Sequence, residues 1–279
     1  MKRGVLFVVG TGIKGVGRIT MEAQAAIEQA DKALYLIGDP VMERWVQKLN
    51  PKSESLYVFY EEGKDRFVSY VKIVERILFH VREGLGVCAA FYGHPGVFSY
   101  SAHEAIRRAR LEGFSAKMLP GISSQDCMFA DLGLDPGRAG CQSFEATDFL
   151  IHRRKFDTRS ALMIWQIGAI GELSFQRQCD PSDGLRELVG YLENYYDGTH
   201  EMVIYEASRN PASDPVIRVV LLEKLPWAGV TRTSTLYIPP KEQAVADPDM
   251  LIRLGLSENG AKTKDEFISL GLTLPYQKL

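Results

Sequence analysis

Short runs of β-branched and other apolar residues alternate with amphipathic segments from residue 4 to about 133 of this 279-residue chain. Within the amphipathic segments, apolar residues recur at spacings of three and four, which is typical of helices that cover one face of a sheet. The alternation predicts an α/β fold with a doubly wound, mostly parallel sheet that binds its ligands outside the carboxyl ends of the strands. The predicted strands are Val5 to Val9, Ala33 to Ile37, Leu56 to Phe59, Val87 to Phe91 and Ala116 to Leu119, with helices near 20–30, 40–49, 64–83, 101–112 and 123–132.

The pattern changes after a turn-rich stretch at residues 134–137, which we interpret as a boundary between two lobes. We expect an N-terminal α/β lobe over residues 1–135, a C-terminal mixed α/β lobe over 136–256 and a polar, partly helical tail over 257–279. One helical crossover among four strands predicts a mixed or largely antiparallel second sheet. Its predicted strands are Ala161 to Ile167, Met202 to Ala207, Val216 to Leu222 and Thr235 to Ile238, with helices near 184–196 and 247–256.

The composition excludes several function classes. The formal net charge is -2 and no concentrated basic field exists, so nucleic-acid binding is not expected. The four cysteines form no CxxC pair, so we expect no zinc or other metal. The longest apolar runs fall short of the ~20 residues of a membrane helix. The apolar run near the N-terminus ends in a glycine loop rather than a small-residue cleavage site, so we expect a cytoplasmic protein.

The glycine loop at residues 10–15 matches GxGxxG and directly follows a predicted strand. A dinucleotide site would place a helix N-terminus at the loop, but the glycines continue to Gly17 and the helix begins near Thr20. Asp39, the acidic residue that would bind a ribose, precedes Pro40 and fits a helix N-cap equally well. We favour a tight turn that needs positive φ and close backbone approach.

Three stretches together resemble the successive loops of tetrapyrrole methylases. They are Val8-Val9-Gly10-Thr11-Gly12 with Ile19-Thr20, then Phe91-Tyr92-Gly93-His94-Pro95-Gly96-Val97-Phe98, then Met118-Leu119-Pro120-Gly121-Ile122-Ser123-Ser124. The resemblance implies the two-lobed tetrapyrrole-methylase fold. It also implies S-adenosylmethionine as cofactor, with S-adenosylhomocysteine as product, held by the second and third loops in a cleft between two lobes.

Within that superfamily the sequence resembles the borosin α-N-methyltransferases, which methylate backbone amides of peptides. The stretch from Ser55 to Tyr70, SLYVFYEEGKDRFVSY, is similar to the segment that supplies their catalytic tyrosines and arginine. The resemblance runs from about Val5 to Leu254. Further matches are Phe129-Ala130-Asp131-Leu132, Phe144 to Leu150, Gln166-Ile167-Gly168 and Ser234 to Pro240.

The resemblance also implies partners. Fungal borosin enzymes carry their own substrate as a C-terminal extension, whereas this sequence stops at Leu279 without a long valine, isoleucine and glycine run. We therefore expect the split arrangement, in which a separate precursor peptide is methylated in trans. The family further implies a homodimer.

Methylation of a backbone amide requires its nitrogen lone pair, which resonance delocalises into the carbonyl group. A base and a donor to the carbonyl oxygen are both needed. Arg66 and Tyr70 are four residues apart in a predicted helix and so share one face. We expect the Arg66 charge to lower the pKa of Tyr70, the candidate base, with Tyr60 and Tyr57 as hydrogen-bond donors. Alternatively, Tyr70 is a half-buried helix residue and Arg66 a solvated surface charge.

The remaining candidate residues rest on the family resemblance. It implies that Tyr92, His94 and Val97 line the methionine or ribose side of the cofactor, followed by Ser123 and Ser124. It implies further that Gln166, Ala207, Ser234 and Thr235 approach the adenine. His94 lacks a partner at metal-ligand spacing, which favours a cofactor-loop role over a metal site.

Other readings of the sequence remain open. The same fold could methylate a corrinoid, another tetrapyrrole or a different small acceptor, or the chain could be a non-catalytic peptide-binding module. Glu145 and Asp148 could form a carboxylate pair for hydrolysis, although a solvated or capping role is favoured. The basic run at residues 152–155 is a loop or a contact to a peptide partner.

Overall fold

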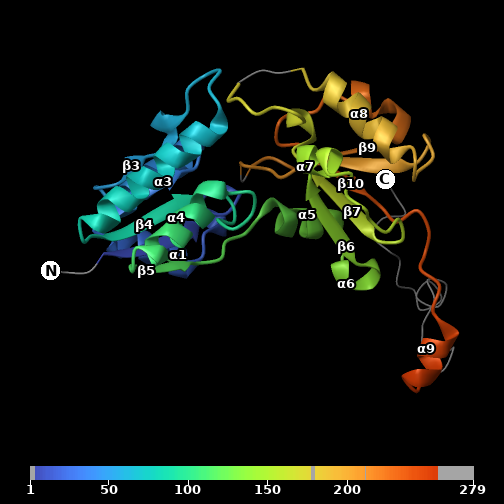
Figure 1. The fold of residues 1–279 in the computed structure, drawn as a ribbon, viewed down its shortest axis with the longest axis horizontal. Helices are drawn as coiled ribbons and strands as arrows, with labels where there is room; N and C mark the ends of the chain where they lie inside the picture. Colours follow the sequence, from blue (N-terminus) through green and yellow to red (C-terminus); the bar gives the residue numbers. More distant parts are fainter. Residues whose placement is uncertain (1–3, 177–179, 211, 257–279) are drawn as a thin grey trace. The chain divides into compact units, whose positions relative to one another are not determined.

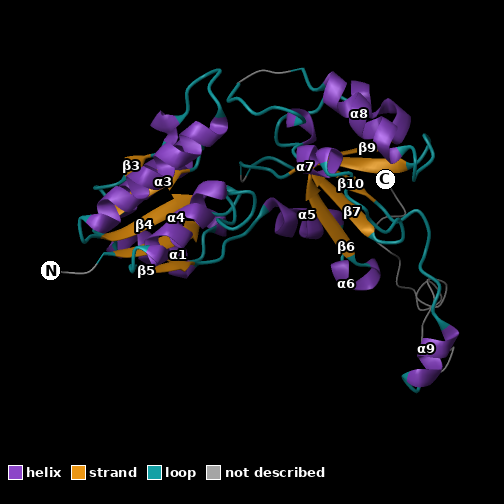
Figure 2. Ribbon diagram, in the orientation of Figure 1, coloured by secondary structure: helices purple, strands orange, loops and turns teal. Residues whose placement is uncertain are grey.

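The computed structural model describes residues 4–176, 180–210 and 212–256, which form two compact units. Of the described residues, unit 1 contains 4–127, 171–176, 207–210 and 212–216. Unit 2 contains 128–170, 180–206 and 217–256. Each unit has its own sheet (Figures 1 and 2). The predicted tail at 257–279 lies outside the described residues.

The sheet of unit 1 has five strands in the order β3-β2-β4-β1-β5. Every strand pair in it is parallel, as the sequence predicts, and β1 pairs with β4 on one side and β5 on the other. The strands are β1 (Val5–Gly10), β2 (Lys32–Leu36), β3 (Glu54–Ser55), β4 (Gly86–Phe91) and β5 (Ser115–Met118).

Helices cover both faces of this sheet. Leu6 and Val8 of β1 pack with α3 and α4 in one hydrophobic core, whereas Val9 packs with α1 and α2 in another. The period-two alternation of β1 therefore divides its side chains between two cores, and the doubly wound arrangement is confirmed. The helical elements of this part of the chain are η1 (Gly15–Arg18), α1 (Met21–Gln29), α2 (Pro40–Leu49), η2 (Tyr57–Phe59), α3 (Arg66–Arg82), α4 (Tyr100–Leu111) and α5 (Ser124–Leu132), the last of which includes residues of both units.

Two helix starts follow directly from local chemistry. The Thr20 hydroxyl accepts from the Ala23 amide at 3.1 Å, so α1 begins where the sequence predicts. The Asp39 carboxylate accepts from the Met42 amide at 2.8 Å, with Pro40 in the first helical turn. The capping interpretation of Asp39 is therefore confirmed.

The strand predicted over Leu56 to Phe59 is wrong. Leu56 is buried in the core, but Tyr57 and Val58 are exposed, so the residues after Leu56 do not alternate between two faces. Their backbone instead closes tight turns, with Phe59 N donating to Leu56 O at 3.2 Å and Tyr60 N to Tyr57 O at 3.0 Å. The aromatic and β-branched composition favoured a strand, but the backbone forms the 3₁₀ turn η2.

Unit 2 contains a five-stranded sheet in the order β6-β7-β10-β8-β9. The sheet is mixed, as the sequence predicts. β6 pairs with β7 in parallel, and β10 pairs antiparallel with β7 and β8. The sequence pattern does not predict β6, because its residues include glutamine, serine and glutamate and are not fully buried. The strands are β6 (Cys141–Glu145), β7 (Ala161–Trp165), β8 (Glu201–Glu206), β9 (Val216–Leu221) and β10 (Thr235–Ile238).

The core of unit 2 gathers buried residues of α7, α8 and η4 against this sheet. Glu145 caps α7 by accepting from the Asp148 amide at 2.8 Å, and Asp148 binds Arg154 at 2.9 Å. Glu145 thus has the capping role that the sequence favoured over a hydrolytic pair, and Asp148 is instead paired with Arg154. The helical elements are α6 (Pro136–Ala139), α7 (Ala146–Ile151), η3 (Ile167–Ala169), α8 (Ser182–Leu192), η4 (Leu222–Trp227) and α9 (Pro248–Arg253).

The glycine loop of unit 1 packs backbone against backbone. A Cβ atom at Gly10 would lie 2.2 Å from the Gly93 carbonyl oxygen, and one at Gly121 would lie 2.7 Å from the same atom. Gly12 has φ of 72° and exchanges two backbone hydrogen bonds with Gly93, at 3.2 and 3.0 Å. The interpretation of this loop as a tight turn with close backbone approach is confirmed. Across the described residues, no helix is both long and apolar enough to cross a membrane.

The substitution Gly10→Ala should destabilise the protein by about 3 kcal/mol, because its methyl group would meet a backbone carbonyl that cannot move aside. Gly17→Ala is the matched control, since a Cβ there meets nothing within 4 Å. Urea unfolding of both variants measures the difference. Equal midpoints for the two variants would contradict the close packing of these loops.

Candidate active site

The loops that follow β1, β4 and β5 meet at the carboxyl edge of the unit 1 sheet, where their glycines pack together. The helix after β1 covers one face of the sheet and the helix after β4 covers the other. The edge between these neighbouring strands is therefore a topological switch point, where open α/β sheets bind their ligands.

The loop after β4 carries Tyr92, His94 and Val97 of the predicted cofactor site. It is held by internal hydrogen bonds from Gly96 N to His94 Nδ1 at 2.9 Å and from Val97 N to His94 O at 3.1 Å. Because Nδ1 accepts, a neutral His94 carries its proton on Nε2. The Arg209 guanidinium lies 5.7 Å from the centre of the Tyr92 ring. Burial raises the pKa of the Tyr92 phenol.

Ser123 and Ser124 lie at the N-terminus of α5, in the third loop. The Ser123 hydroxyl and amide both donate to Asp126 Oδ2, each at 2.7 Å, and the Asp126 amide donates back to Ser123 Oγ at 3.3 Å. This reciprocal pattern stabilises the start of the helix. Contact of the two serines with a cofactor stays a prediction.

The residues predicted to approach an adenine divide between the units. Ala207 belongs to unit 1, while Gln166, Ser234 and Thr235 belong to unit 2. Gln166 has left-handed backbone, with φ of 60°. Ser234 is fully buried, and its hydroxyl donates to Glu206 at 2.5 Å. These contacts give Ser234 a structural role, and the adenine contacts of all four residues stay predictions.

The predicted catalytic segment begins after β3 and ends in the first turns of α3. Leu56 anchors its start in the core, and the Asp65 carboxylate caps α3 by accepting from the Phe67 amide at 2.7 Å. Arg66 and Tyr70 lie four residues apart in that helix, as the spacing predicts. The side chain of Arg66 is only 22% exposed, which argues against a freely solvated surface charge.

The three tyrosines of this segment form a continuous aromatic cluster with two rings from elsewhere in the chain. Its members are Tyr57, Tyr60, Tyr70, Tyr100 and Phe175. The Tyr60 ring centre lies 5.5 Å from that of Tyr57 and 6.3 Å from that of Tyr70. Tyr100, the first residue of α4, lies 6.0 Å from Tyr70, and the Ser101 hydroxyl donates to the Tyr70 carbonyl at 3.4 Å. Tyr100 begins α4, which directly follows the β4 loop along the chain. The cluster is therefore continuous in sequence with the loop that carries Tyr92 and His94.

Residues 171–176, which we call the returning segment, complete the cluster. Gly63 N donates to Phe175 O at 2.7 Å, and Phe175 N donates to Lys64 O at 2.8 Å. These bonds place the Phe175 ring 5.1 Å from Tyr60 and 6.2 Å from Tyr57. The same segment brings Glu172 Oε2 to 3.7 Å from Arg66 Nη2.

Burial controls the ionisation of the two inner phenols. It raises the pKa of Tyr60 and of Tyr70, and the Arg66 charge opposes both shifts without cancelling them. The ionised form of each neighbouring phenol further raises the pKa of Tyr60, as does Asp65 for Tyr70. The expected lowering of the Tyr70 pKa is therefore wrong in net direction, because desolvation outweighs the guanidinium.

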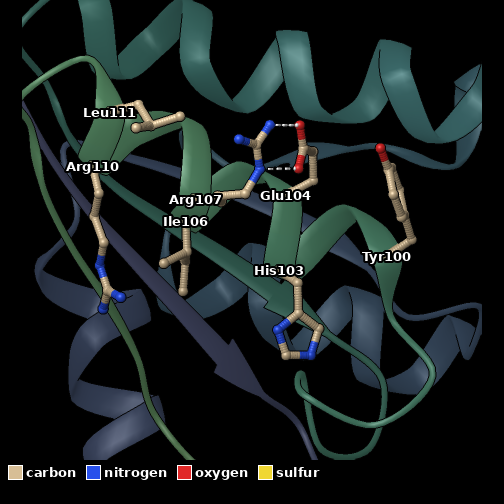
Figure 3. Close-up of a pocket in the computed structure, with 7 residues that line it drawn as sticks. All are labelled: Tyr100, His103, Glu104, Ile106, Arg107, Arg110 and Leu111. Atoms are coloured by element: carbon tan, nitrogen blue, oxygen red, sulfur yellow. Dashed lines mark hydrogen bonds and ion pairs between the residues drawn. The ribbon is translucent and has the colours of Figure 1, made fainter.

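A hollow of about 580 Å³ runs along α4 (Figure 3). Its charged and imidazole side chains already have partners: Arg107 binds Glu104 at 2.6 Å, Arg110 donates to Ala116 O at 3.0 Å, and His103 contacts Gly96 O at 2.9 Å. Tyr100 lines the hollow and also belongs to the aromatic cluster, and we place the candidate site at that cluster. Among the described residues, no three His, Cys, Asp or Glu side chains gather as metal ligands would.

Three members of the site were missed by sequence reasoning: Tyr100, Glu172 and Phe175. Tyr100 lies 30 positions from Tyr70, and the returning segment lies about 100 positions from Arg66, so no local spacing connects them. The tertiary pairing of residues 63–66 with the returning segment reveals Glu172 and Phe175, and the contact between α3 and α4 reveals Tyr100.

Comparisons with known proteins identify the family of this chain. Residues 5–213 match the family model of the tetrapyrrole (corrin/porphyrin) methylases. The chain is 39% identical over 254 residues to the methyltransferase/ribosomally synthesized cyclic peptide dendrothelin A precursor of Dendrothele bispora, covering 90% of this chain and 61% of that protein. It is 38% identical over 263 residues to the corresponding omphalotin A precursor of Omphalotus olearius, covering 93% and 63%. The chain thus spans less than two thirds of these relatives.

Solved structures share the fold at lower identity. Uroporphyrin-III-C-methyltransferase from Thermus thermophilus matches with a TM-score of 0.63 and 20% identity, over 85% of this chain and 95% of that one. The methyltransferase CobJ matches with a TM-score of 0.61 and 18% identity, over 87% and 97%. The resemblances noted in the sequence, to tetrapyrrole methylases and to borosin proteins, are confirmed. The chain belongs to the tetrapyrrole (corrin/porphyrin) methylase family.

Proposed function

We propose that this protein is a methyltransferase that uses S-adenosylmethionine to methylate backbone amide nitrogens of a precursor peptide, as part of borosin biosynthesis. The relatives at 38 to 39% identity, named as fused methyltransferases and cyclic peptide precursors, support a peptide substrate. The observation that carries the proposal is the contact of Tyr70 with Tyr100 and Ser101 at the start of α4, which directly follows the β4 loop.

The loops of unit 1 suit such a cofactor. Their glycines bring backbone into close contact at the switch point, and Tyr92 and His94 add an aromatic face and an imidazole N–H. These groups would hold a small zwitterion with a ribose and a base, and Ser123 and Ser124 would follow at the N-terminus of α5. When bound, the cofactor supplies an activated methyl group on a sulfonium.

The chain's own residues would prepare the amide. Tyr70 would take the amide proton onto its phenolate oxygen, and its ring is held between Tyr60 and Tyr100. Tyr60 and Tyr57 would donate hydrogen bonds to the carbonyl oxygen as it gains negative charge, which is typically worth about 3 kcal/mol per donor. The high pKa of Tyr60 suits this role, because the phenol keeps its proton. Arg66 would stabilise the anionic state through its fixed positive charge.

The assembly is a further part of the proposal. The family resemblance implies a homodimer, and sedimentation of the purified protein tests it.

Methylation of a peptide is the primary test. Mass spectrometry of a precursor co-expressed with the protein should show successive additions of one methyl group, and fragmentation should place them on backbone nitrogens. Side-chain methylation alone would refute the backbone mechanism. Thermal protection by a tetrapyrrole, but not by the peptide, would instead favour a small-molecule acceptor.

Tyr70→Phe should lower turnover at least about a hundredfold while leaving S-adenosylhomocysteine affinity unchanged, because it removes only the proposed base. Tyr35→Phe is the control. Its hydroxyl bonds Gln47 in the core on the opposite face of the sheet from α3 and α4. Single-turnover methylation and calorimetry measure the two quantities. Near-normal turnover of the Tyr70 variant would eliminate Tyr70 as the base.

Turnover should rise with pH. Burial raises the pKa of Tyr70 above its ordinary value near 10, so its phenolate form grows about tenfold per pH unit between roughly pH 7 and 9.

The same raised pKa affects stability, because the folded protein holds the phenolic proton more tightly than the unfolded chain does. That stability is present below about pH 10 and is lost as pH rises through the folded-state pKa. Single-turnover rates, with circular dichroism to confirm folding, provide the check. A flat profile would contradict a phenolate base.

Failure to bind either form of the cofactor would favour a non-catalytic peptide-binding module. Calorimetry with S-adenosylmethionine and with S-adenosylhomocysteine distinguishes this outcome, because both enzyme hypotheses require binding. Catalytic inactivity with intact cofactor binding would leave only the choice of acceptor in question.

A further inference from the structure

The returning segment brings Glu172 to the proposed catalytic arginine. Its backbone pairs with residues 63–66, including a hydrogen bond from Arg66 N to Leu173 O at 3.1 Å. One residue earlier, Glu172 Oε2 lies 3.7 Å from Arg66 Nη2. The same short stretch therefore holds both the backbone and the guanidinium of Arg66.

We infer that Glu172 is a positioning residue that holds the Arg66 guanidinium in its working orientation and balances its charge beside the phenols. This inference rests on the proposed function of Arg66 and Tyr70. Glu172 acts through Arg66.

The local electrostatics favour a counter-charge at this position. Arg66 is the first residue of α3, where the helix macrodipole places partial positive charge and disfavours a guanidinium. The Glu172 side chain is 10% exposed and that of Arg66 is 22% exposed, so water screens the pair only weakly. Glu172 thus offsets a charge that the helix end and the partial burial both disfavour.

Stability alone does not account well for this pair. At 3.7 Å the nitrogen and oxygen are too far apart for a good hydrogen bond, and partly buried ion pairs often contribute little net stability because both charges lose hydration. Orientation is a better account. The guanidinium is flexible on its stem, and a fixed carboxylate limits where it can point.

The charge of the pair also bears on the phenols. Among the described residues, the charged and titratable groups beside Arg66 and Tyr70 include Asp65 at the cap of α3, Glu172 from the returning segment, and the phenols of Tyr60 and Tyr100. Of these, Arg66 alone is cationic, and it lowers the pKa of both Tyr60 and Tyr70. Neutralising Glu172 would remove one of the two carboxylates beside that cation, so we expect the phenols to become more acidic.

Phe175 ties the carboxylate to the rest of the site. It lies three residues beyond Glu172 and packs on Tyr60 and Tyr57, while its backbone bonds Gly63 and Lys64. One short stretch of backbone, the returning segment, therefore contacts Arg66 and the rings of Tyr57 and Tyr60.

Two substitutions separate charge from packing. Glu172→Gln keeps the shape of the side chain and removes its charge, while Glu172→Asp keeps the charge on a shorter stem. Glu75→Gln is the matched control, because Glu75 lies on α3 and pairs with Arg82 and Arg108 at its surface. Each protein is assayed by single-turnover methylation of the peptide across pH, with calorimetric binding of S-adenosylhomocysteine.

We expect Glu172→Gln to lower the maximal rate about ten- to hundredfold, with unchanged peptide KM and cofactor affinity. The acid limb of its pH profile should move to lower pH, because the phenols become more acidic. Glu172→Asp should keep the position of the limb and recover part of the rate, and Glu75→Gln should match the wild type. A rate within twofold of wild type in Glu172→Gln, or a rate lost together with cofactor affinity, would overturn the positioning role.

A second readout keeps this inference separate from the proposed function. The ionisation of Tyr70 is obtained by ultraviolet titration of the full-length protein, as the difference from its Tyr70→Phe counterpart. Glu172→Gln should lower that pKa relative to the wild-type background. If the wild type methylates no peptide, the proposed function fails while this titration still decides the Glu172 interaction, and an unchanged Tyr70 pKa overturns it.

Discussion

The close packing of three glycines underlies the architecture of unit 1. Gly10, Gly93 and Gly121 let the loops after β1, β4 and β5 approach at distances that no side chain would permit. These loops therefore share one edge of the sheet, and α4 begins beside them. Tyr70 reaches that edge through its contacts with Tyr100 and Ser101. The position of Tyr70 beside these loops therefore depends on the close backbone approach that the glycines permit.

Much of the fold could be predicted from local sequence. The period-two burial of β1, the Thr20 and Asp39 caps and the spacing of Arg66 and Tyr70 are all short-range signals, and the structure contains the corresponding elements. Where local signals conflicted, the prediction failed. Residues 56–59 have the composition of a strand but form a 3₁₀ turn, and β6 lacks the apolar pattern of a buried strand.

The candidate site could be predicted only in part for a similar reason. Family resemblance supplied Tyr57, Tyr60, Arg66 and Tyr70, which are close together in the chain. Burial, however, is a tertiary property, and it reverses the expected sign of the Tyr70 pKa shift. A guanidinium near a phenol favours the phenolate, but the loss of hydration around that oxygen is the larger effect here.

The path of the chain carries a consequence for how this protein can be made and divided. Unit 1 is assembled from three separate stretches, with residues of unit 2 between them. A ribosome must therefore release residues 171–176 and 207–216 before the nascent first unit holds Phe175 against Tyr60 or Arg209 against Tyr92. A fragment ending at Cys127 would keep the parallel sheet and lose both of these contacts. Excising the first lobe as a continuous piece would thus yield a scaffold without its finished site.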